Sequence, residues 1–162
     1  MKTTRMVSLD TSSTISGYAY WENAILTKSG ILYHDNEKDT LIRIEDMTID
    51  IINTLRTFNP DIVVIEQPPF CNSPKTCVML AEIVGSAKGY AIASGADFVE
   101  YSVTEWRKLV ADQDEIIPRK RNEAKDWDIN KVRQIYGREV EDDNEADAIL
   151  IGLARIRQFY KQ

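Results

Sequence analysis

A run of β-branched residues limits the possible folds of this chain more than any other feature. Residues 62–65 read IVVI and are followed at once by Glu66. An uninterrupted apolar run of this kind is typical of a strand buried on both faces, as in a parallel sheet covered by helices. The sequence therefore predicts an α/β fold in which residues 61–66 form a buried strand that ends on a carboxylate.

A second apolar strand that ends on a carboxylate is predicted near the N-terminus. Residues 5–21 read RMVSLDTSSTISGYAYW, in which an apolar run stops at Asp10 and a turn leads into a second strand. An amphipathic helix over 38–58 precedes the 61–66 strand, and such a crossover places that strand parallel to the first. Neighbouring parallel strands lie about 5 Å apart, so we expect Asp10 and Glu66 to be neighbours.

Hydrophobic periodicity and turn residues divide the rest of the chain into helices and short strands. Strands are expected over 24–33 and 97–101, a polar loop over 111–124, and helices over 74–95, 104–110 (capped by Thr104), 127–136 and from 142 or 143 to about 159. Trp21, Trp106 and Trp127 are interpreted as core or interface residues. The predicted fold is a single α/β domain, residues 1–162, with a mixed five-stranded sheet and helices on both faces. This order of elements matches the ribonuclease H-like fold.

The composition leaves little room for histidine or disulfide chemistry. His34 is the single histidine, and Cys71 and Cys77 are the two cysteines, which argues against a zinc site, a disulfide framework and a Ser-His triad. No apolar run approaches the roughly 20 residues that span a bilayer, and no signal peptide is recognisable. We therefore expect a cytoplasmic protein without a membrane partner, whose hydrolytic chemistry would use carboxylates, lysines or thiols.

A third carboxylate has an unusual position inside the apolar stretch of the last helix. Asp147 stands between Ala146 and Ala148, although Asp is rarely buried without a partner. If this helix crosses the carboxyl edge of the sheet, it brings Asp147 to Asp10 and Glu66. Three carboxylates gathered there would repel one another unless cations bind, and their oxygens suit Mg²⁺ or Mn²⁺. Two such ions would support phosphodiester hydrolysis.

Ordinary structural roles are the alternative for each carboxylate. Asp10 could accept hydrogen bonds from the turn amides of residues 11–13. Glu66 and Asp147 could each form an ion pair with a basic residue. The candidate partners are Lys75 or Arg107 for Glu66 and Lys125 or Lys131 for Asp147.

Three segments of the chain resemble the active-site segments of RuvC-type Holliday-junction resolvases, in the same order and at the same spacing. They are SLDTSSTISGYAYW, IVVIEQPPF and EADAILIGLAR. The resemblance spans almost the whole chain, and the short phage-encoded members are the most similar. It implies an endonuclease that nicks four-way DNA junctions as a homodimer, in which Asp10, Glu66 and Asp147 bind two Mg²⁺ ions, or Mn²⁺ in their place. The helix over 74–95, rich in small residues, is the expected dimer interface.

The chain departs from this family at the position three residues before Asp147. Where bacterial members carry a fourth metal-binding or catalytic side chain, this chain has Asn144. Asp143 lies on nearly the same helix face as Asp147, so it is the candidate fourth ligand. Its alternative role is helix capping, in which Asp142 or Asp143 is the N-cap and Glu145 completes a capping box from Asp142.

Basic residues cluster before the penultimate helix, although the net charge of −6 taken alone argues against a nucleic-acid partner. Arg119, Lys120 and Arg121 are expected to contact DNA phosphates. Lys125 resembles a lysine of the family and is expected near the scissile group. Phe70, which follows two prolines, is expected to stack on an unpaired base. The alternatives are a solvated surface for the basic residues and a core position for Phe70.

Two other classes of function remain open on the sequence. The DTSSTISG turn also resembles a phosphate-binding loop of sugar and acetate kinases, a phosphotransfer function. Those enzymes need a second lobe, and Asp147 would be unexplained in them. A non-catalytic nucleic-acid-binding module of the same fold would not need all three carboxylates, so replacing Glu66 by Gln would leave its function intact.

Overall fold

Five strands and five helices make up the computed structural model, which describes residues 4–36, 39–68, 73–140 and 142–160. The strands are β1 (Arg5–Asp10), β2 (Ile15–Glu22), β3 (Ile25–Tyr33), β4 (Ile62–Glu66) and β5 (Asp97–Tyr101). The helices are α1 (Thr40–Phe58), α2 (Pro74–Ser94), α3 (Val103–Val110), α4 (Arg121–Tyr136) and α5 (Asp143–Tyr160). The number and order of the predicted elements are confirmed.

The strands form one mixed sheet in the order β3-β2-β1-β4-β5. β1 pairs antiparallel with β2 and parallel with β4, and β4 pairs parallel with β5. Leu9 on β1 lies opposite Ile65 on β4. The next residues along the two strands, Asp10 and Glu66, therefore come at the same end of the sheet, as the crossover predicts.

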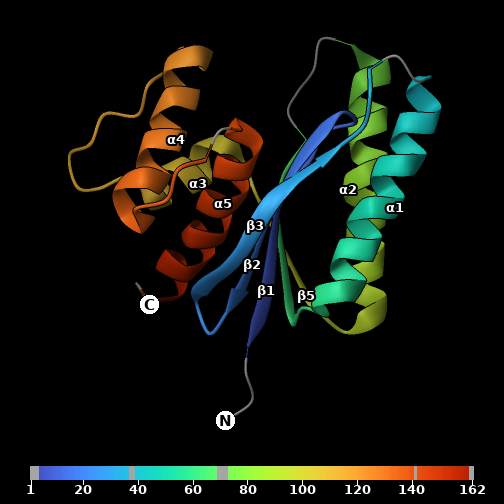
Figure 1. The fold of residues 1–162 in the computed structure, drawn as a ribbon, viewed down its shortest axis with the longest axis horizontal. Coiled ribbons are helices and arrows are strands. Elements are labelled where there is room, and N and C mark those ends of the chain that lie inside the picture. The colour runs from blue at the N-terminus through green and yellow to red at the C-terminus, as the bar shows by residue number, and fades with distance from the viewer. Residues whose placement is uncertain (1–3, 37–38, 69–72, 141, 161–162) are drawn as a thin grey trace.

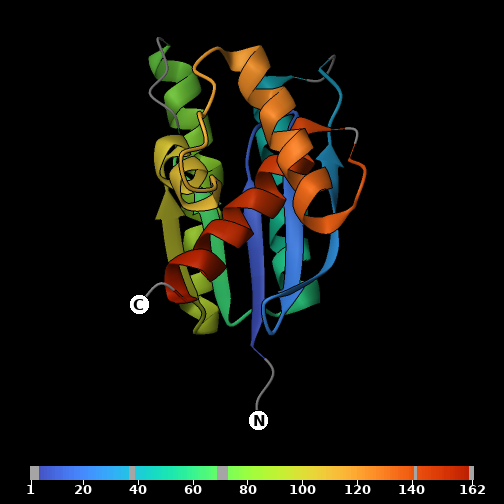
Figure 2. The same ribbon diagram turned by 90° about the vertical axis from the view of Figure 1, so that its left-hand side faces the viewer.

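Helices cover both faces of this sheet (Figure 1). α1 and α2 pack on one face, whereas α3, α4 and α5 form the other layer, in which α5 crosses the strands diagonally (Figure 2). Leu9 and Ile65 belong to the apolar core beneath α1 and α2, while Met6 and Val64 belong to the core beneath α5. The two cores follow from the pleat of a strand, whose successive side chains point to opposite faces.

Two helices begin at other residues than predicted. α4 starts at Arg121, whereas the sequence predicts a start near residue 127. Its first turn is polar and exposed, and its N-cap makes no side-chain hydrogen bond. Neither apolar periodicity nor a capping residue therefore marks this start. α3 is capped by Ser102, which forms a capping box with Glu105, rather than by Thr104.

α2 is long and apolar enough to cross a membrane by length and composition, with 22% of the relevant window buried. One such helix is weak evidence for a membrane segment, because core helices of soluble proteins pass the same test. In this fold α2 packs against α1 and against β4 and β5. Apolar side chains of α2 therefore pack against the rest of the fold.

Candidate active site

Asp10 and Glu66 stand at the carboxyl ends of β1 and β4 and belong to the face that α5 covers. Strand residues two positions apart share a face. Ser8, two residues before Asp10, is hydrogen-bonded to α5, and Val64, two residues before Glu66, lies in the core beneath α5. Both carboxylates therefore point toward the layer that contains α5.

Close packing holds the first half of α5 over β1 and β2. Ser8 Oγ donates a hydrogen bond of 2.6 Å to the carbonyl oxygen of Ala148. A Cβ atom on Gly17 would lie only 1.8 Å from the carbonyl oxygen of Asn144, so the approach of α5 to β2 requires a glycine there. These contacts fix the turn of α5 that carries Asp147.

The site carboxylates, which we define as Asp10, Glu66 and Asp147, act on one another electrostatically. Burial raises the pKa of Asp10 well above its ordinary value, and the charges of Glu66 and Asp143 raise it further. Burial likewise raises the pKa of Asp147 well above its ordinary value, with further contributions from Asp128 and Asp10. Burial also raises the pKa of Glu66. Elements far apart in the sequence thus bring acids together in a way that favours cation binding.

Neighbouring side chains hold these acids in their present orientations. Trp106 Nε1 donates a hydrogen bond of 2.7 Å to Glu66 Oε2, and Lys125 forms an ion pair with Asp143. Asp147 Oδ1 is buried and has no hydrogen-bond partner within the described part of the chain. In these orientations, no three His, Cys, Asp or Glu side chains among the described residues form a metal-ligand set. The donor chemistry suits Mg²⁺, but the side chains would have to move from these orientations to form one set of ligands.

Most of the ion pairs considered as alternative roles for Glu66 and Asp147 are wrong. The basic candidates bind other carboxylates: Arg107 pairs with Asp128, Lys125 with Asp143, and Lys131 with both Asp112 and Glu115. One of the turn amides considered as a donor to Asp10, that of Ser12, donates its hydrogen bond to Ser16 Oγ.

The capping hydrogen bond of α5 comes from Asp142 and not from Asp143. Asp142 Oδ1 accepts a hydrogen bond of 2.8 Å from the backbone N–H of Asn144. Glu145, predicted to close a capping box, accepts a hydrogen bond of 2.6 Å from Ser29 Oγ on β3. Asp143 is therefore not needed as the cap, and its carboxylate is paired with Lys125 instead.

The predicted DNA-binding residues lie at the start of α4. Arg119, Lys120 and Arg121 are exposed there. Lys125, one turn further along α4, reaches the carboxylates through its ion pair with α5. Phe70 lies outside the described residues. The ion pair of Lys125 connects α4 to the start of α5, and phosphate binding by these basic residues stays a prediction.

Three side chains join the site without having been assigned to it from the sequence. Trp106, predicted as a core residue, is fully buried and also binds a site carboxylate. Arg107 donates to both oxygens of Asp128, at 3.2 and 2.5 Å, and Asp128 is 0% exposed. The signal for Asp128 is its spacing of one helical turn from the buried Ala124. That signal was missed because the predicted helix began after Ala124.

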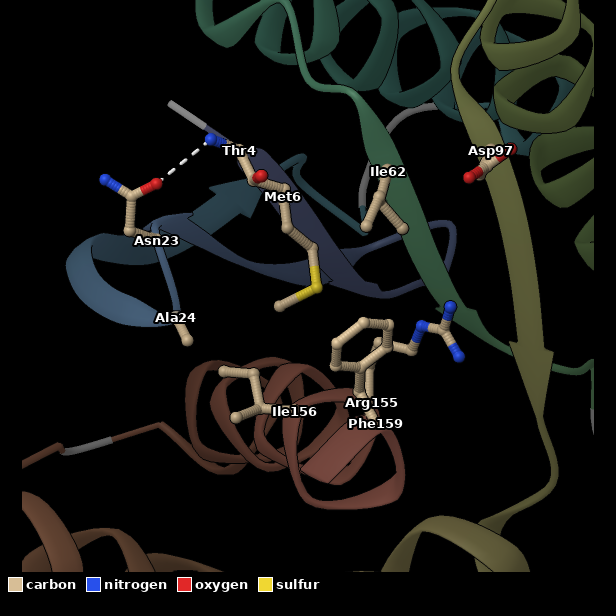
Figure 3. A pocket seen from close by; sticks show the side chains of 9 residues that line it. All are labelled: Thr4, Met6, Asn23, Ala24, Ile62, Asp97, Arg155, Ile156 and Phe159. Carbon is tan, nitrogen blue, oxygen red and sulfur yellow. Dashed lines mark hydrogen bonds between the residues drawn. The ribbon is translucent and has the colours of Figure 1, made fainter. Parts of the chain in front are cut away.

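The pocket shown in Figure 3 lies at the opposite end of β1 and β4 from the carboxylates. Met6 and Ile62 line it near the start of these strands, and Ile156 and Phe159 line it from the end of α5. Its volume is about 380 Å³, and none of the predicted site residues lines it. The acidic chemistry and this cavity are therefore separate features.

Comparison by sequence finds a resolvase relative over part of the chain. No family model matches the chain. It is 24% identical over 110 residues to the crossover junction endodeoxyribonuclease RuvC of Geotalea uraniireducens (strain Rf4). This alignment covers 65% of the chain and 64% of the relative, so it spans less than two thirds of the relative's length.

Comparison by structure extends the likeness to nearly the whole chain. A structure of Thermus thermophilus RuvC in complex with a Holliday junction substrate gives a TM-score of 0.73 at 15% identity, covering 98% of this chain and 96% of that one. The yeast mitochondrial Holliday junction resolvase gives a TM-score of 0.60 at 14% identity, covering 95% and 78%. This chain therefore resembles RuvC in sequence and has the ribonuclease H-like fold of the RuvC resolvases, as predicted.

Proposed function

We propose that this chain is a metal-dependent endonuclease that nicks four-way DNA junctions and related branched DNA. One observation carries the proposal: Asp10 and Glu66 end neighbouring parallel strands on the face that α5 covers, and their charges act on Asp147 of α5. The similarity to RuvC in sequence and the shared fold support the same class of substrate.

Four carboxylates would hold the metal ions. Asp10, Glu66 and Asp147 would bind two Mg²⁺ ions, or Mn²⁺, with Asp143 as the fourth ligand. Ions held in this way stabilise the charge on an attacking water and on the departing oxygen during phosphodiester hydrolysis. The chain itself supplies the orientation, because close packing of α5 on β1 and β2 fixes the Asp147 backbone and Asp147 Oδ1 has no competing partner among the described residues.

Basic side chains beside the carboxylates would hold the DNA backbone. Lys125 would contact the scissile phosphate once cations replace it as the partner of Asp143. Arg119, Lys120 and Arg121 would bind the flanking phosphates, which makes junction binding depend on salt. Alanine at all three positions should weaken junction binding and flatten its dependence on salt concentration. Unchanged affinity would remove this part of the proposal.

A two-fold homodimer would place two such sites on one junction, because resolving a junction needs two symmetry-related nicks. The expected interface is α2, on which Val78 and Ile92 are 58% and 64% exposed. The working compartment would be the cytoplasm, that of the host if the chain is phage-encoded.

Nicking of a synthetic four-way junction tests the proposal. The wild type should nick with Mg²⁺ and stop with EDTA, and Glu66→Gln should lower the rate about a thousandfold, since the metal contributes several kcal/mol. Glu100→Gln on the adjacent strand β5 is the matched control and should retain activity. Nicking by Glu66→Gln at the wild-type rate would contradict the proposal. Binding without nicking by the wild type would favour a non-catalytic module.

A further inference from the structure

The pocket at the amino ends of β1 and β4 is formed mainly by regular elements. Met6, Ile62 and Asp97 lie side by side in the register of β1, β4 and β5. The end of α5 lies across this row, and Ile156 and Phe159 line the pocket from it (Figure 3). The hollow of about 380 Å³ is therefore enclosed between the sheet and a helix that packs on it.

The turn between β2 and β3 closes one side of this pocket. The backbone N–H of Thr4 donates a hydrogen bond of 3.1 Å to Asn23 Oδ1, and the N–H of Asn23 donates one of 2.9 Å to the Thr4 carbonyl oxygen. Ala24, the next residue of the turn, also lines the pocket. These reciprocal bonds hold the turn against the start of β1. Preformed walls around a hollow of this size are typical of a small-molecule site.

Apolar side chains from β1, β4 and α5 make up most of the lining, and Arg155 adds a cation. Arg155 is half-buried, and its hydrogen-bonding neighbours, Gln158 and Tyr101, are neutral. Among the described residues, no carboxylate lies within ion-pair distance of its guanidinium. Asp97 lines the same pocket, but its side chain is exposed, so water screens its charge. A partly buried cation without a counter-ion favours an anionic partner.

We propose that this pocket binds a small amphipathic anion, with its apolar part between the sheet and α5 and its acidic head at Arg155. The inference does not depend on the proposed nuclease function, because the pocket lies at the opposite end of β1 and β4 from the site carboxylates. A medium-chain carboxylate has the required chemistry, since it combines a flexible apolar chain with an acceptor for the guanidinium.

NMR titrations with octanoate, octylammonium and octanol test the head group, because the three probes share one apolar chain. Octanoate should shift the amide signals of Met6, Ile62 and Ile156 saturably. It should bind about tenfold or more tightly than the other two probes, since only its carboxylate can accept charge-assisted hydrogen bonds from the guanidinium. Octylammonium binding as tight as that of octanoate would overturn the inference. The absence of saturable octanoate binding would overturn it as well.

Variants of the lining separate the head from the chain. Arg155→Gln should weaken octanoate binding about tenfold, whereas Asp97→Asn should not weaken it, because it removes a like charge. Phe159→Ala should weaken binding severalfold by removing part of the apolar wall. Ile49→Ala on α1, in the opposite layer, is the matched control for an exposed apolar side chain and should change nothing (55% exposed, against 65% for Phe159).

Melting of each variant would confirm that it is folded. Phe159 is exposed near the end of α5, so its replacement keeps the test decisive even if Arg155→Gln destabilises the fold. Wild-type affinity for octanoate in folded Phe159→Ala and Arg155→Gln would overturn the inference. Weaker octanoate binding by Asp97→Asn would also overturn it, because the acidic head would then not be placed at Arg155.

Discussion

The loop after α3 and the carboxyl edge of the sheet are both rich in acidic residues, yet their charges have opposite surroundings. In the loop, Lys131 Nζ lies 2.6 Å from both Asp112 and Glu115. The hydrogen bond from Lys131 lowers the pKa of Asp112. Burial would raise the pKa of Glu115, but hydrogen bonds, led by that of Lys131, lower it overall. We call these three residues the loop latch.

Among the described residues, no ion pair joins a cation directly to the site carboxylates, and the charges of Lys125 and Arg107 only partly offset the raised pKa values of Asp10 and Glu66. Burial raises the pKa of Asp10, Glu66 and Asp147, and in Asp10 and Asp147 the neighbouring acids add to this effect. Charging a carboxylate whose pKa is raised in the folded state lowers the free energy of unfolding, whereas charging one whose pKa is lowered increases it. The latch therefore stabilises the fold near neutral pH, whereas the charged acids at the sheet edge lower its stability.

Asp147→Asn should produce the largest effect, because it removes one of the site carboxylates. Loss of one ligand carboxylate should lower the rate of Mg²⁺-dependent nicking about a thousandfold. The fold should persist, since Asn has nearly the same shape and removes one repelling charge. Junction nicking and thermal melting of the same preparation would check both results. Activity near that of wild type would show that Asp147 is not a ligand.

Gly17→Ala should separate α5 from the sheet edge. The added Cβ would lie 1.8 Å from the carbonyl oxygen of Asn144, so α5 must move. Overpacking of this kind costs about 1–3 kcal/mol of stability, and a shift near 1 Å in a catalytic group costs about a hundredfold in rate. Urea unfolding and nicking assays would measure both. Gly85→Ala is the matched control for the unfolding measurement, because nothing lies within 4 Å of its added Cβ.

Asp10→Asn should stabilise the metal-free protein near neutral pH by about 1 kcal/mol, because it removes a buried charge among like charges. The raised pKa means that folded Asp10 is already protonated at about pH 4, so the gain should shrink there. Mg²⁺ should stabilise the wild type and not this variant. Denaturant unfolding at both pH values, with EDTA or Mg²⁺, would measure the changes. A gain that is equal at the two pH values would contradict the assigned charge.

Glu115→Gln should have the smallest effect, and unlike Asp10→Asn it should destabilise the fold near neutral pH. It removes one carboxylate of the latch and should lower the free energy of unfolding near neutral pH by about 1 kcal/mol or less, since Glu115 is partly solvated. The lowered pKa keeps folded Glu115 charged below its ordinary range, so its contribution is lost only as the pH falls through that lowered value. The loss of stability should therefore fade in strong acid. The same unfolding experiment would check it. A stabilising effect near neutral pH would contradict the claim that the latch stabilises the fold.

Local patterns were enough to predict the strands and the main carboxylates. The apolar runs that end at Asp10 and Glu66 mark strand ends directly, and Asp147 stands out because its neighbours are apolar. The parallel pairing of β1 with β4 then places the first two together. These features depend on periodicity and on general rules of strand connection, which a single sequence contains.

Features that depend on distant partners could not be predicted. Asp128 is buried in an ion pair with Arg107, which lies on another helix, and the start of α4 carries no capping signal. The choice between Asp142 and Asp143 as the cap is decided by a hydrogen bond to Asn144. Trp127, interpreted as a core or interface residue, does pack half-buried against the core, but its hydrogen bond to Glu115 of the latch could not be predicted. Such choices depend on tertiary packing, which sequence periodicity does not specify.

Anomalous diffraction from crystals of this protein soaked in Mn²⁺ would test the central claim most directly. The account predicts Mn²⁺ bound between the carboxylates of Asp10, Glu66 and Asp147. Crystals of Asp10→Asn should lose that density. Mn²⁺ bound only elsewhere on the molecule, with the three carboxylates unchanged, would contradict the account.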